Sequence, residues 1–252
     1  MRHGTRLSTA GLLPMLLLSA CAGQVHRVPK PTEAQVTAAE RDVLAEPDLV
    51  TRRTMTASEA SQTLAAVVRR IHPAGQQVCQ EARSGNCYWR YRFSPDRSLN
   101  AASTESGYVI LNRGLVELTA NDDEIAFVLG HELGHHTANH PATGGTNARV
   151  GGLIGGLLGG NLGHAIGYTI GAVSYSKEQE READYLGVVI AYRAGVDLDK
   201  ARGVVLTMTR MSGKRESTLL DTHPEGAERL AGYDRAVAAV RASNGALPPR
   251  AK

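Results

Sequence analysis

The chain has 252 residues, a formal net charge of +3, 42% hydrophobic residues, only 4% aromatic residues and 27 glycines. This length suits one domain of moderate size after a processed leader. A core so poor in aromatic residues must be built from Ala, Val, Leu and Ile on helices, which argues against an all-β protein. No cluster of Lys and Arg able to bind phosphates is present, so no nucleic-acid partner is implied.

Residues 1–20 have the pattern of a secretory signal peptide, with a basic start and an apolar run too short to span a membrane. The LSAC sequence that ends at Cys21 resembles a bacterial lipobox, in which the cysteine is acylated and begins the mature protein. We therefore expect a lipid anchor, including palmitate, on Cys21. Because Ala22 rather than Asp follows, the resemblance to sorted lipoproteins implies the periplasmic face of the outer membrane. The alternative is an ordinary cleaved signal with a chance cysteine.

Residues 21–50 are polar and contain three prolines, so we expect the lipidated cysteine to be followed by a tether. One short helix is expected within it, around residues 33–45. Apolar residues at helical spacing then predict a core helix over residues 58–71.

Residues 76–81 and 87–93 are expected to form a hairpin, with residues 107–112 as the third strand of a small antiparallel sheet. Cys79 and Cys87 would face each other across this hairpin, and export to an oxidising compartment favours a disulfide between them. Zinc binding by the pair is the weaker alternative, because no companion cysteine is left. We hypothesise that an extended substrate adds to the third strand at the sheet edge.

A helix is predicted from residue 121 to about residue 140, where Asn121 supplies the cap, acidic residues fill the first turn and Pro141 ends it. It contains an H-E-x-x-H pattern that begins at His131 and ends at His135. The two histidines are one turn apart, so both imidazoles project from the same face and can bind one zinc ion.

Glu132 stands beside these histidines and indicates hydrolysis. Zinc lowers the pKa of water toward about 7, so Glu132 can take a proton as water attacks a peptide carbonyl and later pass it to the leaving amine. The pattern predicts a zinc-dependent peptidase with one metal ion per chain. His136 and His140 are interpreted as packing or supporting groups.

A third ligand is expected from a helix predicted over residues 176–194. The chain lacks the third histidine of the metzincin pattern, and a carboxylate from a later helix is the other common solution. Glu178, Glu180 and Glu182 compete for this role. Glu180 is preferred because Asp184, one turn further on, can accept a hydrogen bond from a ligand histidine and fix its tautomer. The other two glutamates are then expected to be solvated.

The glycine-rich apolar stretch at residues 150–173 is long enough to cross a bilayer. Crossing would separate Glu180 from the predicted zinc helix, so we favour a buried or mobile helical hairpin. Further helices are predicted at residues 199–211 and 224–243, and the tail after Asn244 is expected to be loose.

These motifs, in this order, resemble a family of gluzincin metallopeptidases, that of the CAAX prenyl protease and HtpX, in its periplasmic lipoprotein branch with LoiP and BepA. The resemblance covers roughly residues 95–240. It rests on the segments Asn100-Ala101, Gly107–Ile110, Gly114-Leu115, Asp123–Ala126, His131–His136 and Ser176–Asp184. The last of these looks like the E-x-x-A-D ending of the family, which implies that Glu180 is the ligand.

The family also has a later His-Pro with an arginine six positions after the histidine, matched here by His223-Pro224 and Arg229. The resemblance implies that these side chains approach the cleft and stabilise the oxyanion formed when water adds to the carbonyl. In some periplasmic relatives the corresponding histidine instead occupies the open position of the metal and silences the enzyme. Which role His223 plays stays open.

We therefore expect a mainly helical α+β protein, an H-E-x-x-H zincin of the gluzincin type with a small antiparallel sheet beside the active-site helix. The expected organisation is a signal peptide at 1–20, the lipidated cysteine and tether at 21–50, a metallopeptidase domain at 51–245 and a flexible tail at 246–252.

The function expected from the resemblance is that of a zinc-dependent endopeptidase on the periplasmic face of the outer membrane. Its substrates would be misfolded or stalled envelope proteins, and the outer-membrane assembly machinery is a candidate partner. Two alternatives remain. One is a zinc-stabilised chaperone or assembly factor that holds clients without cutting them. The other is a membrane-remodelling protein with a vestigial site, suggested by the glycine-rich stretch.

Overall fold

The computed structural model describes four segments of the chain, residues 24–45, 53–143, 175–211 and 226–251. The predicted signal peptide, Cys21, the glycine-rich stretch at 150–173 and His223 lie outside these described residues. Within them the protein is mainly helical with one small sheet, as expected. No helix in these segments is apolar over a sufficient length to span a bilayer.

α2 (Ala57–Ala82) is longer than the core helix predicted over residues 58–71. Its buried apolar stripe continues past Pro73 to Val78, so packing against the rest of the protein holds this stretch as a helix. The strand predicted at residues 76–81 is therefore wrong, and so is the hairpin.

The sheet has the strand order β1-β3-β2, formed by β1 (Arg90–Ser94), β2 (Ala101–Ser103) and β3 (Tyr108–Asn112). β1 runs parallel to β3 and β2 runs antiparallel to it, so the sheet is mixed and not antiparallel as predicted. Because β1 follows a loop and has no hairpin partner before it, it is free to pair with β3 in the parallel sense. The third predicted strand is central and paired on both sides, so the hypothesis that a substrate adds to it at an edge is wrong.

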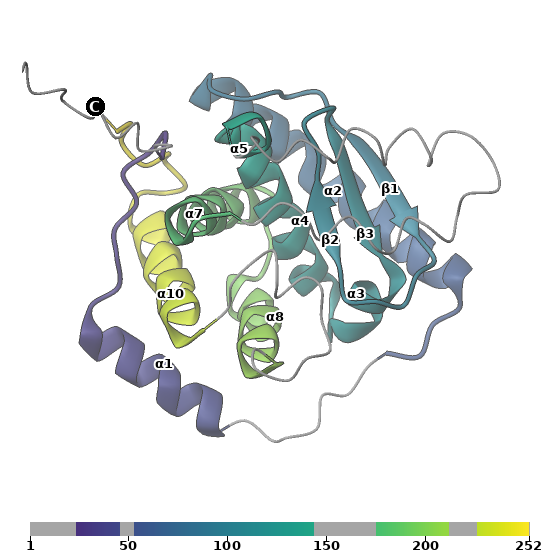
Figure 1. Cartoon of the computed structure of the whole chain (residues 1–252), viewed down its shortest axis with the longest axis horizontal. Helices are drawn as coiled ribbons and strands as arrows, with labels where there is room; N and C mark the ends of the chain where they lie inside the picture. The colour runs from purple at the N-terminus through teal and green to yellow at the C-terminus, as the bar shows by residue number, and fades with distance from the viewer. Residues whose placement is uncertain (1–23, 46–52, 144–174, 212–225, 252) are drawn as a thin grey trace, which may run out of the picture.

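α3 (Arg113–Leu118) leads from the sheet into α4 (Asp122–Thr137), which lies at the centre of the structure (Figure 1). The Asn121 side chain caps α4 by accepting a hydrogen bond from the backbone N–H of Glu124. Every residue of α4 from Glu124 onward is buried, because α2 and the sheet pack around it together with helices from the C-terminal half. Polar side chains on α4 must therefore find their partners inside the protein.

α4 ends at Thr137, earlier than the predicted end near His140. Asn139 adopts the left-handed conformation, with φ of 60°, and reverses the chain. Pro141 lies in the first turn of the short helix α5 (His140–Thr143), a position that suits its fixed φ and missing N–H. The turn brings the side chain of His140 back against α4.

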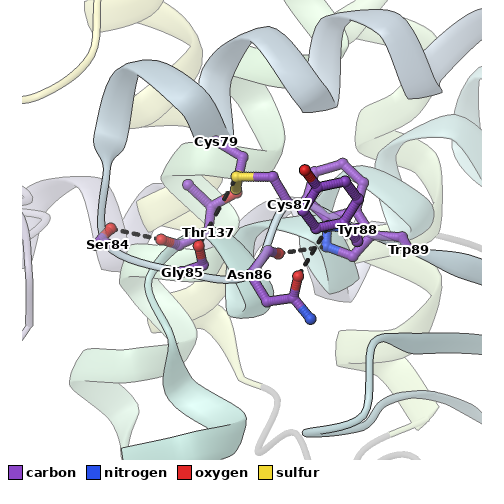
Figure 2. The surroundings of a disulfide bond; sticks show 8 residues. All are labelled: Cys79, Ser84, Gly85, Asn86, Cys87, Tyr88, Trp89 and Thr137. Carbon is purple, nitrogen blue, oxygen red and sulfur yellow. Dashed lines mark hydrogen bonds between the residues drawn. A yellow bond between two sulfur atoms is a disulfide. The ribbon is translucent and has the colours of Figure 1, made fainter.

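The predicted disulfide between Cys79 and Cys87 is present, but it joins the last turn of α2 to the following loop and does not link two strands (Figure 2). The two Cα atoms are 5.7 Å apart. Within this loop the Ser84 hydroxyl donates a hydrogen bond of 2.6 Å to the carbonyl oxygen of Thr137. The loop therefore caps the C-terminal end of α4.

α7 (Lys177–Arg193) packs closely against α4, and both partners use glycine at the contact. A Cβ atom added to Gly134 would lie 2.5 Å from the carbonyl oxygen of Ala183, and one added to Gly187 would lie 2.9 Å from the backbone nitrogen of His131. Only the missing side chains allow this approach. It brings the start of α7 beside the histidines of α4.

α8 (Leu198–Met211) and α10 (Ala227–Ala242) confirm the later predicted helices, and α1 (Glu33–Ala45) confirms the short helix expected in the tether. α1 packs mainly on α10 and also contacts α8 (Figure 1).

The segment before α1 is docked on the C-terminal end of the chain. Arg27 donates a backbone hydrogen bond of 2.7 Å to Pro249, and Ala251 donates one of 2.9 Å to Val25. Figure 1 accordingly shows the purple N-terminal segment beside the yellow C-terminal one. The described start of the expected tether is thus fixed to the domain, and the tail that we expected to be loose has backbone partners.

Candidate metal centre

His131 and His135 on α4 converge with Glu180 on α7 in the buried interior. The Nε2 atoms of the two histidines are 3.1 Å apart. One carboxylate oxygen of Glu180 lies 3.3 Å from Nε2 of His135, and the other lies 3.5 Å from Nε2 of His131. Two imidazoles and one carboxylate from a later helix are a donor set that suits zinc. The group could hold a metal ion.

Asp184 supports the ring of His131 from the other side. Its carboxylate accepts a hydrogen bond of 2.8 Å from Nδ1 of His131, and Arg229 donates two more of 2.8 Å from Nε and Nη2. Burial raises the pKa of Asp184, but the Arg229 guanidinium and the His131 ring outweigh it and hold this pKa below its usual value. An ionised Asp184 keeps the proton of His131 on Nδ1, which leaves the Nε2 lone pair for a metal.

Glu132 lies beside the pair of histidines and is buried. Its Oε2 accepts a hydrogen bond of 2.8 Å from the hydroxyl of Ser103 on β2.

Tyr175 stacks on the ring of His135 with 3.9 Å between the ring centroids. Burial, with a smaller contribution from the charges of Glu132 and Glu180, raises the pKa of Tyr175, so its hydroxyl keeps its proton.

Burial also lowers the pKa of His135 well below its usual value, so this ring is neutral at pH 7. Its neighbour His136 points to another face of α4, as expected, and burial lowers its pKa to about 4. Neutral imidazoles are the form that binds metal ions. The electrostatic state of the centre therefore agrees with the chemistry of its donor set.

The expectation that Glu182 is solvated is wrong, whereas Glu178 is exposed as predicted. Glu182 is fully buried and accepts hydrogen bonds from His26, from the backbone N–H of Val25 and from His140. Burial raises the pKa of Glu182, but the hydrogen bonds from His140 and His26 lower it by more. The pKa of this carboxyl is therefore below its usual value.

His26 and its contact with Glu182 were missed from the sequence. The almost unbroken run of small and apolar residues from Ala183 to Ala191 predicts a helix buried on all sides, which is the signal that could have placed Glu182 inside. No comparable signal marks His26, because it lies in a short polar segment far away in the chain.

The structure thus brings together six of the residues singled out from the sequence, namely His131, Glu132, His135, Glu180, Asp184 and Arg229. A hollow adjoins them on the side of α10, lined in part by Lys177, Arg181 and Arg229. His223 and Cys21 lie outside the described residues, so the structure does not place them.

Comparison with known proteins identifies a family. Residues 65–236, more than half of the chain, match the model of peptidase family M48. A search of curated proteins gives no match.

Proposed function

Since the chain belongs to peptidase family M48 and is therefore a metallopeptidase, we propose that it is a zinc-dependent endopeptidase whose metal is held by His131, His135 and Glu180. The observation that carries this proposal is the convergence of the two Nε2 atoms and the Glu180 carboxylate inside a buried site. The carboxylate of Asp184 and the neutral state of His135 fit a metal at this position.

A bound zinc ion supplies Lewis acidity and lowers the pKa of water. Glu132 is the general base in this proposal, because its carboxylate lies beside the two histidines and is oriented by the Ser103 hydroxyl. It takes the proton of the attacking water and delivers it to the leaving amine. The surrounding burial excludes bulk solvent from this proton transfer.

The contacts of Arg229 support a further role besides the one that the family resemblance implies. Two of its nitrogens donate to Asp184, and Nη1 lies 3.6 Å from Glu180. These contacts support Arg229 as the residue that holds the two carboxylates in place. Stabilisation of the oxyanion by Arg229, and either role of His223, stay predictions.

The proposed location of substrate binding also differs from the one expected from the sequence. Among the described residues, β2 is the end strand of the sheet on the side of α4, and its Ser103 contacts the proposed base. We propose that an extended polypeptide aligns along β2 in place of the central β3, because unpaired backbone groups occur only at a sheet edge.

The remaining proposals concern the cell envelope. The leader and the LSAC sequence support acylation of Cys21 on the periplasmic face of the outer membrane, in the lipoprotein branch of the family. The Cys79–Cys87 disulfide supports an oxidising compartment. In that setting the substrates would be misfolded or stalled envelope proteins, with the outer-membrane assembly machinery as a partner.

The test compares the purified wild-type chain with Glu132→Gln, using metal analysis and digestion of an unfolded protein. We expect one zinc ion per chain in both proteins and cleavage by the wild type alone. Cleavage by both would contradict the assigned base. A holding activity that survives in Glu132→Gln, without any cleavage by the wild type, would favour the chaperone alternative.

A further inference from the structure

A chain of buried hydrogen bonds connects the N-terminal segment to the ring of His135. Nδ1 of His135 lies 2.9 Å from Nδ1 of His140, and Nε2 of His140 lies 3.3 Å from Oε2 of Glu182. Oε1 of Glu182 lies 2.8 Å from Nδ1 of His26. These four side chains come from α4, α5, α7 and the segment before α1, and none is more than 1% exposed.

The carboxylate of Glu182 determines where the protons of this chain lie. A carboxylate only accepts hydrogen bonds, and Oε1 already receives the backbone N–H of His26 at 2.7 Å while Oε2 receives that of Val25 at 3.0 Å. Nε2 of His140 must therefore carry a proton in order to donate to Glu182. In a ring with one proton, Nδ1 of His140 is then an acceptor.

This acceptor faces Nδ1 of His135, which must donate to it. The proton of His135 is thereby fixed on Nδ1, and its Nε2 lone pair points to the position shared with His131 and Glu180. The proton of His131 is likewise fixed on Nδ1, in this case by direct hydrogen bonding to Asp184. Each histidine of the proposed centre thus depends on a carboxylate of α7, one in direct contact and the other through an intervening imidazole.

We propose that His140, Glu182 and His26 are positioning residues that fix His135 in the tautomer able to bind zinc. The N-terminal segment, which carries His26, is then part of the metal centre. This inference rests on the proposed function, because it takes His135 as a ligand. Substitution of supporting residues of this kind typically lowers metal affinity by about 10- to 100-fold.

Two near-isosteric substitutions of His140 separate this role from simple packing. His140→Asn keeps an acceptor near the Nδ1 position, whereas His140→Gln keeps a donor near the Nε2 position and loses the acceptor that faces His135. We expect His140→Gln to weaken zinc binding by roughly 10- to 100-fold and His140→Asn by clearly less. His26→Leu should weaken it in the same direction, because Glu182 loses a donor. The measurement is the zinc dissociation constant of the full chain by competition with a chelator.

Tyr233→Phe is the matched control. It removes a buried hydrogen bond to the carbonyl of Leu198 that involves no residue of the proposed centre, and should leave zinc affinity unchanged. The second measurement is ¹⁵N NMR of the histidine rings in the metal-free full chain. We expect His135 to carry its proton on Nδ1 in the wild type and in His140→Asn, and to lose this preference in His140→Gln.

Equal zinc affinity in the wild type and both His140 variants would overturn the inference, as would a proton on Nε2 of His135 in the wild type. Loss of affinity in Tyr233→Phe to the same degree would show that the effect is general destabilisation, and would also overturn it. Failure of the wild type to bind zinc at all would instead refute the proposed function.

Discussion

Glu180 and Glu182 are two positions apart on α7 and serve opposite sides of it. The oxygens of Glu180 face Nε2 of His131 and His135, whereas those of Glu182 face His26 and His140. Two carboxylates so close in sequence are kept from the same site by the helical rotation of about 200° between them. The outcomes of substitution should therefore differ in kind across the centre.

Ser103→Ala should reduce turnover while leaving zinc binding intact, because the hydroxyl contacts Glu132 and none of the proposed ligands. A hydrogen bond to a charged group contributes about 1.5–3 kcal/mol, so we expect kcat to fall by roughly 10- to 100-fold. Steady-state kinetics on an unfolded protein substrate and metal analysis measure the two effects. A variant that loses zinc would contradict this assignment of Ser103.

Arg229→Met should destabilise the protein strongly, because it leaves the buried carboxylate of Asp184 without its guanidinium partner. Removing one member of a buried ion pair costs about 3–5 kcal/mol. The control is Lys177→Met, which removes an exposed pair with Glu228 and should cost less than about 1 kcal/mol. Urea denaturation of both variants measures the free energies of unfolding, and equal losses would show that the Arg229 contacts contribute little.

Gly134→Ala should separate α4 from α7, since the added Cβ would lie 2.5 Å from the carbonyl oxygen of Ala183. Overpacking of this kind costs about 1–3 kcal/mol, and the shift should also weaken zinc binding because the ligands sit on both helices. Gly232→Ala is the control: nothing lies within 4 Å of the added Cβ, and alanine favours the helix by up to about 1 kcal/mol. Thermal unfolding should therefore move in opposite directions for the two variants.

Removal of the disulfide by the double substitution Cys79→Ala and Cys87→Ala should lower stability by about 2–3 kcal/mol, as expected for a short closed loop. The loop also contacts the C-terminal end of α4 through Ser84. Denaturation of the wild type with and without a reducing agent gives the same comparison in one protein. If the reducing agent destabilises the double variant as well, the effect does not come from this bond.

Much of the candidate centre could be predicted because its signals are local. His131 and His135 share one face of a helix by spacing alone, and Glu180 with Asp184 repeats that spacing on a second helix. The caps at Asn121 and Ser176 likewise mark the starts of both helices in the sequence. Patterns of this kind depend only on helix geometry.

The errors arose where distant contacts decide the structure. Residues 76–81 lie beyond Pro73, which disfavours a helix interior, and their burial against α4 keeps α2 continuous past this proline. The parallel pairing of β1 with β3 depends on a crossover that short-range patterns do not encode. Glu182 was misjudged because its partners, His26 and His140, lie 156 and 42 residues away in the sequence.

If the proposed lipid anchor on Cys21 is present, the docking of the first described residues limits how far the domain can lie from the membrane. Gln24 already donates a hydrogen bond to the backbone carbonyl of Glu178, two residues before the proposed ligand Glu180 on α7. If Cys21 carries acyl chains, the three covalent steps from it to Gln24 span only about 10 Å at full extension. A linker that short would keep the domain close to the lipid headgroups. Its substrates would then be polypeptides that emerge at that surface, and soluble proteins further away would have to diffuse to it.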